Sequence, residues 1–533
     1  MSIDLSLDRI RELLAHFPVP YTRPTIHVAG TNGKGSVCAY VSSILATAEP
    51  PLVVGRFNSP HLLNWLDGIS IQNKPVTFDT FWPVRNEIDA INTTHDIGAS
   101  NFEQYTCMAL LIFERLHVDV VVLEVGMGGR LDATNVVPDE CILVSALTSV
   151  DLDHQALLGD TVELITREKA AIVRKGKPFV LGPQVHRQVE AVAREIVEAV
   201  GGELLPPCSV VPVDWDENLD GPQRPAGAGI GVPLLQPVQI SMPAFAEPVR
   251  ALLPLHGAHQ YGNLGTAAGI VSALLTHPSV QLHVPGLQLR ERLTPVTIAR
   301  GVRATRWPGR LSYHNITLPA DPATGQEELR LTVLADGAHN PASAAALAAY
   351  LSSMLEKTSK GPLNLTYILG LSHSPPKTPV QTLGPLLAVH SQLSKTRDVR
   401  LGAALLAFTK PARMPWISAV PPATMHAAID TLVPPSSSSS SQSESESKST
   451  IDIYEDEPEV PEEQVQPGAD PDKQVLERPP RTEHVERALR WAAGRRREGE
   501  DTLVVLAGSL YLVADFYRLL QKYGQADEIW GAN

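Results

Sequence analysis

A glycine-rich loop near the start of the chain constrains the fold more than any other feature. It reads Gly30-Thr31-Asn32-Gly33-Lys34-Gly35-Ser36, between an apolar run at 25–28 and a run of small residues at 37–48. This order predicts a strand, a loop and a helix. Such a loop offers backbone N–H groups and a helix N-terminus to a phosphate, and Lys34 adds a positive charge. The loop indicates a nucleotide-binding α/β protein.

The spacing of this loop differs from the common phosphate-binding pattern G-x-x-x-x-G-K-[ST]. Val28 stands where the first glycine would be, and Gly35 separates Lys34 from the hydroxyl of Ser36. Taken alone, the loop fits a phosphate site and a plain turn equally well. The rest of the chain has to decide between these two interpretations.

Apolar segments alternate with helical patterns in two successive series, which predicts two domains with mostly parallel sheets and helices on both faces. The expected strands are 25–29, 119–125, 142–148, 331–335, 365–371, 403–408 and 502–507. The expected helices include 102–116, 162–174, 185–199, 261–275, 341–355 and 482–496. We place the domains at 1–310 and 311–533.

Two segments have the composition of insertions outside the packed cores. Residues 214–233 are rich in Gly, Pro and Asp. The segment 434–482 begins with a serine run and holds 12 acidic and 4 basic residues, a net charge of −8 out of −14 for the chain. This composition predicts disorder, and a passive surface loop is favoured over a phosphorylated segment.

Charge and cysteine content exclude several classes of protein. A net charge of −14 argues against nucleic acid as the main partner. The four cysteines are widely spaced, which favours reduced, buried thiols over disulfides or a zinc site. No apolar run approaches the roughly 18 residues of a membrane span, and the acidic N-terminal stretch resembles no signal or transit peptide. We expect a cytoplasmic enzyme.

Glu124 is a candidate metal ligand at the end of a predicted strand. Gly126, Gly128 and Gly129 follow it closely. Ligands of open α/β sheets gather beyond the carboxyl ends of strands, where Glu124 would hold Mg²⁺ against a phosphate on the first loop. A glycine-rich turn with a solvated glutamate is the equally simple alternative.

His154 and Lys169 form a third signal. His154 follows the predicted strand 142–148, where it is suited to bind a metal, although a lone histidine more often does not. Lys169 stands within an apolar helical pattern. A lysine facing a buried site needs a partner or a modification because desolvating its ammonium is costly. The alternative is an exposed lysine whose stem lies along apolar surface.

Three further motifs are each weak evidence for a functional site, but their order along the chain and their joint occurrence are informative. They are His256–Asn263, Trp307–Arg310 and Asp336–Pro341. The last one ends a predicted apolar strand and opens a predicted helix, so it should lie at the carboxyl edge of a sheet.

Taken together, these residues resemble the folylpolyglutamate synthase/dihydrofolate synthase family of the Mur-ligase superfamily. The matching motifs, in family order, are 30–36, Ser59-Pro60-His61-Leu62, 124–135, 153–154, 167–169, 307–310 and 336–340. The resemblance also accounts for Gly35, since the family's loop carries a glycine after the lysine. Residues 414–417 and 508–512 are similar to the C-terminal half of fungal dihydrofolate synthases.

The resemblance implies an N-terminal P-loop ATPase domain of the Mur-ligase type and a C-terminal Rossmann-like domain. It implies two Mg²⁺ ions, with Ser59 and Glu124 binding one and His154 the other, and a carbamylated (N6-carboxylated) Lys169 assisting the second. The implied ATP-binding residues are Thr31, Asn32, Gly33, Lys34, Gly35, Ser36, Asn263, Arg310 and Asp336. The implied substrate residues are Asp4, Leu5, Arg130, Leu131 and Asp132 for the pterin, with His339 and Ser509 for glutamate. Lys34, Lys169 and His339 are the implied catalytic residues.

The implied reaction is ATP-driven ligation of L-glutamate to 7,8-dihydropteroate through an acyl phosphate, by a monomer. A folylpolyglutamate synthase or a bifunctional enzyme is the alternative. Eukaryotic polyglutamate synthases usually resemble Gly-Thr-Lys-Gly-Lys-Gly-Ser, so Asn32 favours dihydropteroate as the substrate. A non-catalytic relative would be expected to lack metal ligands, and all of them are present. A cell-wall Mur ligase would need a uridine-nucleotide-binding domain before residue 30.

Overall fold

The computed structural model describes residues 6–222, 230, 235–320, 325, 327–357, 361–373, 377–410, 417–433, 451–455 and 481–530. Two compact units result, one from residues 1–223 and 235–307 and one from 224–234 and 308–533. The division after Trp307 lies close to the boundary that we place after residue 310. The predictions for Asp4, Leu5, 414–416 and most of 434–482 fall outside the described residues.

The first unit is built on an eight-stranded sheet in the order β4-β3-β2-β5-β1-β6-β7-β8. Its strands are β1 (Thr25–Ala29), β2 (Val54–Phe57), β3 (Ile69–Ile71), β4 (Lys74–Pro75), β5 (Val120–Glu124), β6 (Ile142–Leu147), β7 (Pro178–Leu181) and β8 (Glu203–Leu205). All neighbours pair in parallel except at β3 and β4, which run antiparallel at one edge. The prediction of a mostly parallel sheet is confirmed.

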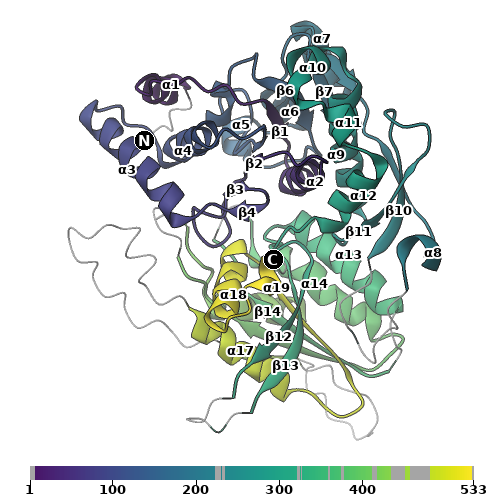
Figure 1. Cartoon of the computed structure of the whole chain (residues 1–533). Coiled ribbons are helices and arrows are strands. Elements are labelled where there is room, and N and C mark those ends of the chain that lie inside the picture. Colours follow the sequence, from purple (N-terminus) through teal and green to yellow (C-terminus); the bar gives the residue numbers. More distant parts are fainter. Residues whose placement is uncertain are drawn as a thin grey trace, which may run out of the picture. The chain divides into compact units, whose positions relative to one another are not determined.

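Both faces of this sheet are buried, as the continuous apolar strands predict. In β5, Val120 and Val122 join a core with residues of α2, α9 and α12, whereas Val121 and Leu123 join a core with α3 and α4. Figure 1 shows α3 and α4 to the left of β2 and α9 and α12 to its right. The helices of this unit are α1 (Asp8–Ala15), α2 (Lys34–Ala46), α3 (Phe78–Thr94), α4 (Asn101–Arg115), α5 (Gln155–Leu158), α6 (Val162–Ala170), α7 (Arg187–Val200), α8 (Glu217–Asp220), α9 (His259–Thr276), α10 (Pro278–His283), α11 (Leu289–Arg292) and α12 (Pro295–Ala304). The predicted helix 162–174 therefore ends early, at Ala170.

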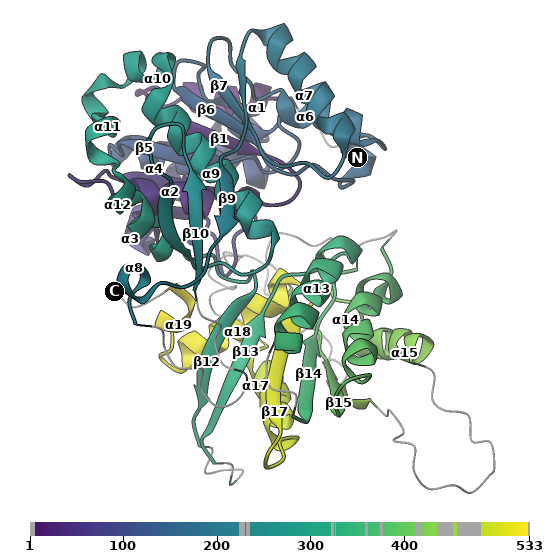
Figure 2. The ribbon, with the colours of Figure 1, turned by 90° about the vertical axis from the view of Figure 1, so that its right-hand side faces the viewer.

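A small antiparallel sheet, absent from the sequence prediction, follows the parallel one. It has the order β11-β10-β9, with β9 (Ser209–Pro212), β10 (Gln236–Ser241) and β11 (Val249–Leu253) (Figure 2). Its strands contribute Val238, Ile240 and Val249 to the same core as α2 and α9. The small sheet thereby packs against α2, which follows the glycine loop, and against α9.

The second unit contains a six-stranded sheet in the order β12-β13-β17-β14-β15-β16. Its strands are β12 (Ser312–Leu318), β13 (Leu329–Ala335), β14 (Leu363–Leu369), β15 (Val399–Leu405), β16 (Asp452–Glu455) and β17 (Asp501–Ala507). Only β12 runs antiparallel to its neighbour. The helices are α13 (Pro341–Lys357), α14 (Pro379–Leu393), α15 (Pro422–Leu432), α17 (Thr482–Gly494), α18 (Leu510–Lys522) and α19 (Asp527–Trp530).

Both predicted insertions are partly wrong. Ile230 belongs to the second unit and is buried in its core with β14 and α13, because an isolated apolar side chain gains by leaving water. Residues 452–455 form β16, which pairs in parallel with β15. The side chain of Asp452 lies against Arg495, and Glu455 lies against His426. The composition of the two segments did not predict the burial of Ile230 or the strand β16, because both depend on packing against residues that are distant in the sequence.

The four cysteines, Cys38, Cys107, Cys141 and Cys208, are all buried and free, as their spacing predicts. Among the described residues, no helix is both long enough and apolar enough to cross a membrane.

Candidate active site

The glycine loop connects β1 to α2, and two of its glycines are required by their surroundings. Gly30 has a φ of +150°, and a Cβ there would lie 1.8 Å from Oγ1 of Thr148. Gly33 has a φ of +95°, and a Cβ there would lie 2.4 Å from Oδ1 of Asn263. Glycine lacks the Cβ that makes such contacts and such φ values unfavourable. The loop therefore packs closely against both β6 and α9.

The loop is fastened to the segment that follows β6. The backbone N–H groups of Thr31 and Asn32 both donate to the carbonyl of Ser149, at 2.9 and 3.0 Å. The Thr31 hydroxyl donates to the carbonyl of Asp151 and accepts from the Asp151 N–H, each at 3.1 Å. Helix α2 then begins at Gly33, which has no side chain to cap the first N–H groups. The first N–H groups of α2 therefore have no side-chain cap, and uncapped N–H groups at a helix start are a common binding site for anions.

Asn263 lies against this loop, as the sequence predicts. Its amide nitrogen donates to Oε1 of Gln260 at 3.1 Å, and the Gln260 amide donates to the Ser36 hydroxyl at 3.4 Å. Gln260 is only 1% exposed. Sequence reasoning missed Gln260, although its position one turn before Asn263 on the same helix face was a usable signal.

Glu124 ends β5 beside the loop and is 5% exposed. Its Oε2 accepts from the amide of Asn58 at 2.7 Å, and its Oε1 lies 4.0 Å from Nζ of Lys34. Asn58, which directly precedes Ser59 after β2, is a second residue that sequence reasoning missed. A carboxylate oxygen such as those of Glu124 is a hard ligand of the kind that suits Mg²⁺, and so is the hydroxyl type that Ser59 carries. The donor set therefore fits the predicted ion.

Two lysines converge on one carbonyl oxygen. Nζ of Lys34 donates to the carbonyl of Gly30 at 3.1 Å, and Nζ of Lys169 donates to the same oxygen at 3.0 Å. Lys169 is 3% exposed. Burial, together with the charge of Lys34, lowers the pKa of Lys169 from 10.5 to about 7, although Asp153 and Asp132 oppose this shift. A large fraction of Lys169 is thus a neutral amine near pH 7.

His154 lies at the end of the segment after β6, with its side chain 50% exposed. It has a φ of +51°, and its Nε2 lies 3.8 Å from Oδ2 of Asp153. The neighbouring Asp151 pairs instead with His186, at 3.1 Å. Within the part of the chain that the structure describes, no group of three or more His, Cys, Asp and Glu side chains forms a ready metal cluster.

The three predicted residues 130–132 lie in two different places. Arg130 and Leu131 line a groove, whereas Asp132 lies inside its own loop. A groove of about 460 Å³ is lined by Ser6, Leu7, Asp8, Arg11, Arg130, Leu131, Asn135, Asp139 and Arg174. Arg130 is exposed and pairs with Glu168 at 3.0 Å. Asp132, by contrast, is buried and accepts from the N–H groups of Met127 and Thr134, at 2.8 and 3.0 Å. Asp132 thus holds the loop in place and does not line the groove.

In the second unit, Asp336 follows β13 and is buried. Its two oxygens accept from the N–H groups of Leu311 and Ala338, at 2.7 and 2.8 Å. Burial raises the pKa of Asp336, and the nearby Arg310 guanidinium opposes that shift. Nη1 of Arg310 donates to the carbonyl of Gly309 at 3.0 Å. The two predicted residues lie close together, and the carboxylate fixes the backbone around Arg310.

His339 and Ser509 also lie at the carboxyl edge of this sheet. Nδ1 of His339 lies 3.0 Å from the carbonyl of Gly337. Ser509 follows β17, and its hydroxyl accepts from the N–H of Tyr511 at 3.2 Å and lies 3.1 Å from the Ser372 hydroxyl. Ser372, which follows β14, is a third residue that sequence reasoning missed. The neighbouring order of β13, β17 and β14 gathers these side chains along one edge.

Comparison with known proteins gives a consistent result. Residues 323–519 match the family described as dihydrofolate synthetase, C-terminal domain. The chain is 32% identical to the dihydrofolate synthetase of Saccharomyces cerevisiae, over 79% of this chain and 86% of the yeast protein. It is 29% identical to the probable dihydrofolate synthetase of Schizosaccharomyces pombe, over 81% of this chain and 88% of that protein.

A solved structure shares the fold. The folylpolyglutamate synthase of Mycobacterium tuberculosis, complexed with ADP and AMPPCP, matches with a TM-score of 0.63 and 24% sequence identity. The match covers 96% of this chain and 95% of the mycobacterial one. At this level of identity, the similarity extends the fold to nearly the whole chain.

Proposed function

The chain belongs to the folylpolyglutamate synthase/dihydrofolate synthase family of ATP-dependent ligases, and we propose that it is a dihydrofolate synthase that joins L-glutamate to 7,8-dihydropteroate. The observation that carries this proposal is the 32% identity to a dihydrofolate synthetase over 79% of the chain. Asn32 within the glycine loop supports the same substrate choice.

The proposed chemistry has two steps. A carboxylate oxygen of dihydropteroate attacks the γ-phosphorus of ATP, and the bond to the β–γ bridging oxygen breaks, giving an acyl phosphate and ADP. The α-amine of glutamate then attacks the acyl carbon, loses a proton and expels phosphate through a tetrahedral intermediate, which forms the amide. Both steps bring negative charges together, so positively charged groups and aligned N–H donors are the expected stabilisers.

The glycine loop of the first unit is the proposed phosphate site. The uncapped start of α2 presents N–H groups and the positive end of the helix dipole to an anion. Lys34 supplies the charge, since its Nζ lies at the loop, 3.1 Å from the carbonyl of Gly30. Asn263 borders the same loop from α9. Arg310 and Asp336 remain proposed ATP contacts on the second unit.

The oxygen ligands at the loop suit magnesium. Ser59 and Glu124 would hold one Mg²⁺, and His154 would contribute to a second. When bound, such ions neutralise the charge that accumulates between the carboxylate and the phosphates. The Asn58 amide at 2.7 Å orients the Glu124 carboxylate for that role, and the Lys34 ammonium lies 4.0 Å away.

Carbamylation of Lys169 is part of the proposal. The neutral amine attacks the carbon of CO₂, an N–C bond forms, and one proton passes to solvent, which leaves a carbamate anion. The side chain is 3% exposed, and its pKa lies at about 7, so it supplies the neutral amine that this reaction needs. The modification also exchanges a buried cation beside Lys34 for an anion, which relieves the repulsion between the two lysines.

The groove beside Arg130 and Leu131 is the proposed site for the pterin. Its volume of about 460 Å³ and its mixture of apolar side chains with three arginines and two aspartates suit a flat molecule with several polar groups. His339 and Ser509 are proposed to receive glutamate at the edge of the second sheet. We further propose a monomer in the cytoplasm, which size-exclusion chromatography and fluorescence microscopy would test.

The deciding experiment compares two substrates. ATP hydrolysis to ADP is followed with L-glutamate plus dihydropteroate and, separately, with L-glutamate plus tetrahydrofolate. The proposal predicts turnover with dihydropteroate. Turnover with both substrates would identify a bifunctional enzyme, and turnover with tetrahydrofolate alone would overturn the proposal in favour of a folylpolyglutamate synthase.

A further inference from the structure

Gly35, the residue that makes the spacing of the glycine loop irregular, lies against the ring of Trp307. A Cβ on Gly35 would lie 2.2 Å from Cζ2 of the indole and 2.8 Å from Cε2. Gly35 lies in the first turn of α2, so its helical backbone is open to other residues. The ring of Trp307 therefore excludes any side chain at this position.

Trp307 is itself held from another direction. The guanidinium carbon of Arg56 lies 5.4 Å from the ring centroid, which is the distance of a cation–π contact. Arg56 is 7% exposed, and its Nη1 donates to the Ser42 hydroxyl on α2 at 3.0 Å. The indole thus contacts the start of α2 and an arginine that is bonded to the middle of the same helix.

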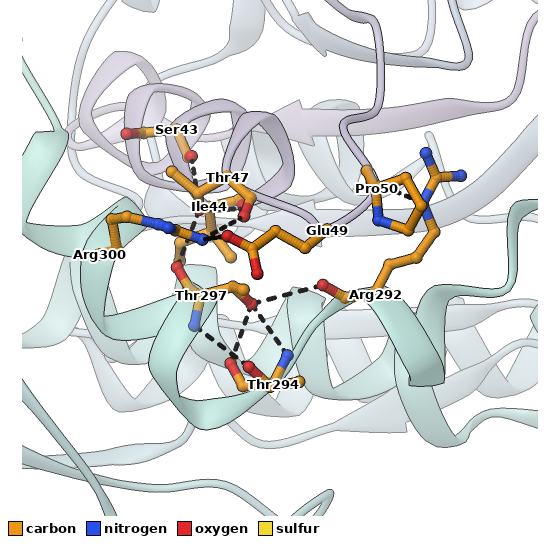
Figure 3. A network of polar contacts seen from close by, with 9 residues as sticks. All are labelled: Ser43, Ile44, Thr47, Glu49, Pro50, Arg292, Thr294, Thr297 and Arg300. Carbon is orange, nitrogen blue, oxygen red and sulfur yellow. Dashed lines mark hydrogen bonds and ion pairs between the residues drawn. The ribbon is translucent and has the colours of Figure 1, made fainter.

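The chain leading to Trp307 is clamped onto the far end of α2. The Ser43 hydroxyl donates to the carbonyl of Gly301 at 2.7 Å. Figure 3 shows a neighbouring bond, in which the Thr47 hydroxyl donates to the carbonyl of Thr297 at 2.8 Å. A Cβ on Gly301 would lie 2.5 Å from Cα of Ile44, so α12 and α2 are in backbone contact. Helix α12 ends at Ala304, and Trp307 follows three residues later.

Two arginines add further bonds to the end of α2 and the residues that follow it. Arg300 donates to the Thr47 carbonyl at 3.2 Å and pairs with Glu49, and Arg292 donates to the carbonyl of Pro50 at 2.8 Å (Figure 3). Because α12 is fixed to α2 over this length, the residue that follows α12 has a fixed position relative to the start of α2. The indole is thereby placed by a rigid support.

We propose that Trp307 is a positioning residue of the phosphate-binding loop, whose indole holds the first turn of α2 in the geometry that binds the ATP phosphates. This inference rests on the proposed function, since it assumes that nucleotide binds at this loop. It assigns a role to the tryptophan of the 307–310 motif that is separate from that of Arg310. It also explains why the loop has a glycine between Lys34 and Ser36.

The test measures binding of ATP with Mg²⁺ by calorimetry in four proteins besides wild type. They are Trp307→Ala, Trp307→Phe, Gly35→Ala and the double variant Gly35→Ala/Trp307→Ala. We expect Trp307→Ala to raise the Kd for ATP about tenfold or more, because displacement of a positioning contact by about 1 Å is that costly. Trp307→Phe should recover part of the loss.

The double variant tests the contact itself. Gly35→Ala alone forces a methyl group into the indole and should weaken ATP binding, whereas in the Trp307→Ala background the vacated space accepts the methyl. The double variant should therefore bind ATP about as well as Trp307→Ala does, with no further loss from the methyl group. Coupling of this kind is expected only for residues in contact. A general loss of folding would instead lower the number of ATP sites that calorimetry counts per protein and leave the Kd unchanged.

Matched controls are Gly286→Ala, where nothing lies within 4 Å of the added methyl, and Trp215→Phe, whose indole donates to the carbonyl of Gly221. Both should leave the Kd for ATP unchanged. If wild type binds no ATP, the proposed function fails and this inference fails with it. If wild type binds ATP but Trp307→Ala binds equally well, or the Gly35 and Trp307 effects simply add, only this inference is overturned.

Discussion

Helices α2 and α18 both begin at the carboxyl edge of a mostly parallel sheet, and their first turns are built in opposite ways. Helix α2 follows β1 in the first unit and starts from Gly33, which offers no side chain as a cap. Helix α18 follows β17 in the second unit and starts from Ser509, whose hydroxyl accepts from the Tyr511 N–H. The same strand–turn–helix arrangement thus leaves one N-terminus open and satisfies the other internally.

The charged side chains near the two helix starts also differ in how far other groups of the protein already bind them. Beside α2, the side-chain nitrogens of Lys34 and Lys169 share the carbonyl of Gly30, and Glu124 lies 4.0 Å from that of Lys34. At the edge of the second sheet, the Asp336 carboxylate is already occupied by two backbone N–H groups. An open helix start among unneutralised charges suits an anionic ligand, whereas a capped start among satisfied groups maintains structure. The chemistry is therefore expected to be most sensitive to change in the first unit.

The largest effect is expected from Lys169→Ala. Loss of the carbamate should lower turnover by about 10²–10³-fold, the range for loss of a principal electrostatic group. ATP should still bind, because the loop and Lys34 remain. Added small carboxylates such as formate, entering the vacated space, should restore part of the activity in steady-state assays. Near-normal turnover of the variant without added carboxylate would contradict the carbamate assignment.

Gly33→Ala should close the open helix start. The new Cβ would lie 2.4 Å from Oδ1 of Asn263, at a φ of +95°. We expect ATP affinity to fall about tenfold or more through displacement of the loop, with about 1–3 kcal/mol of lost stability from the backbone conformation. Calorimetry and urea unfolding measure the two quantities.

Gly98→Ala is the matched control, since Gly98 has a φ of +68° with nothing within 4 Å of an added methyl. It should lose stability without losing ATP affinity. Equal affinity losses in the two variants would mean that the loop contact with Asn263 is unimportant.

Acid stability tests both units through one buried histidine in each. Burial lowers the pKa of His27 to about 3 and that of His314 to about 4. As pH falls below about 6.5, the unfolded chain binds a proton at each site while the folded chain does not, so the folded state loses stability. Each histidine should contribute up to about 1.4 kcal/mol per pH unit between pH 6.5 and its folded pKa.

Urea unfolding at pH 7, 6 and 5 measures this slope. His27→Gln and His314→Gln should each flatten it, while the exposed His117→Gln should not. An unchanged slope in His27→Gln would show that the pKa of this histidine is the same in the folded and unfolded chains, against the prediction.

The smallest effect is expected from Ser509→Ala. Loss of the cap on α18 should cost about 1 kcal/mol, and ATP affinity should not change. A raised KM for glutamate would support the proposed role of this serine at the substrate. Ser372→Ala removes the partner hydroxyl, 3.1 Å away, and keeps the cap, so it separates the two contributions.

Much of the architecture could be predicted because it depends on local patterns. The strand at Thr25–Ala29 and the helix start at Pro341 are as predicted, and most other ends differ by a few residues. The strand predicted at 403–408 is displaced, since β15 spans Val399–Leu405. The prediction began after Arg400 because a charged residue does not fit an apolar pattern. In the fold, Arg400 forms an ion pair with Glu500 and remains within the strand. The antiparallel strands β9–β12 were missed because their pairing partners are set by the fold.

The candidate site was predicted in part for the same reason. Lys34, Glu124 and Lys169 could be named because each follows or interrupts an apolar pattern. Asn58 could not, because it is one polar residue among many until packing brings it to Glu124. Gln260 was missed although it lies one turn before Asn263 on the same helix, and its contact with Ser36 is visible only in the fold. Asp132 was expected at the pterin, yet its carboxylate faces the backbone of its own loop.

The sequence by itself determined the order of strands and helices, the glycine loop between β1 and α2, and the placing of charged residues at strand ends. These follow from period, composition and turn chemistry, which act over a few residues. Only the tertiary structure decided that two lysines share the Gly30 carbonyl and that Trp307 lies over Gly35. Those contacts join segments far apart along the chain, and their geometry depends on how whole elements pack.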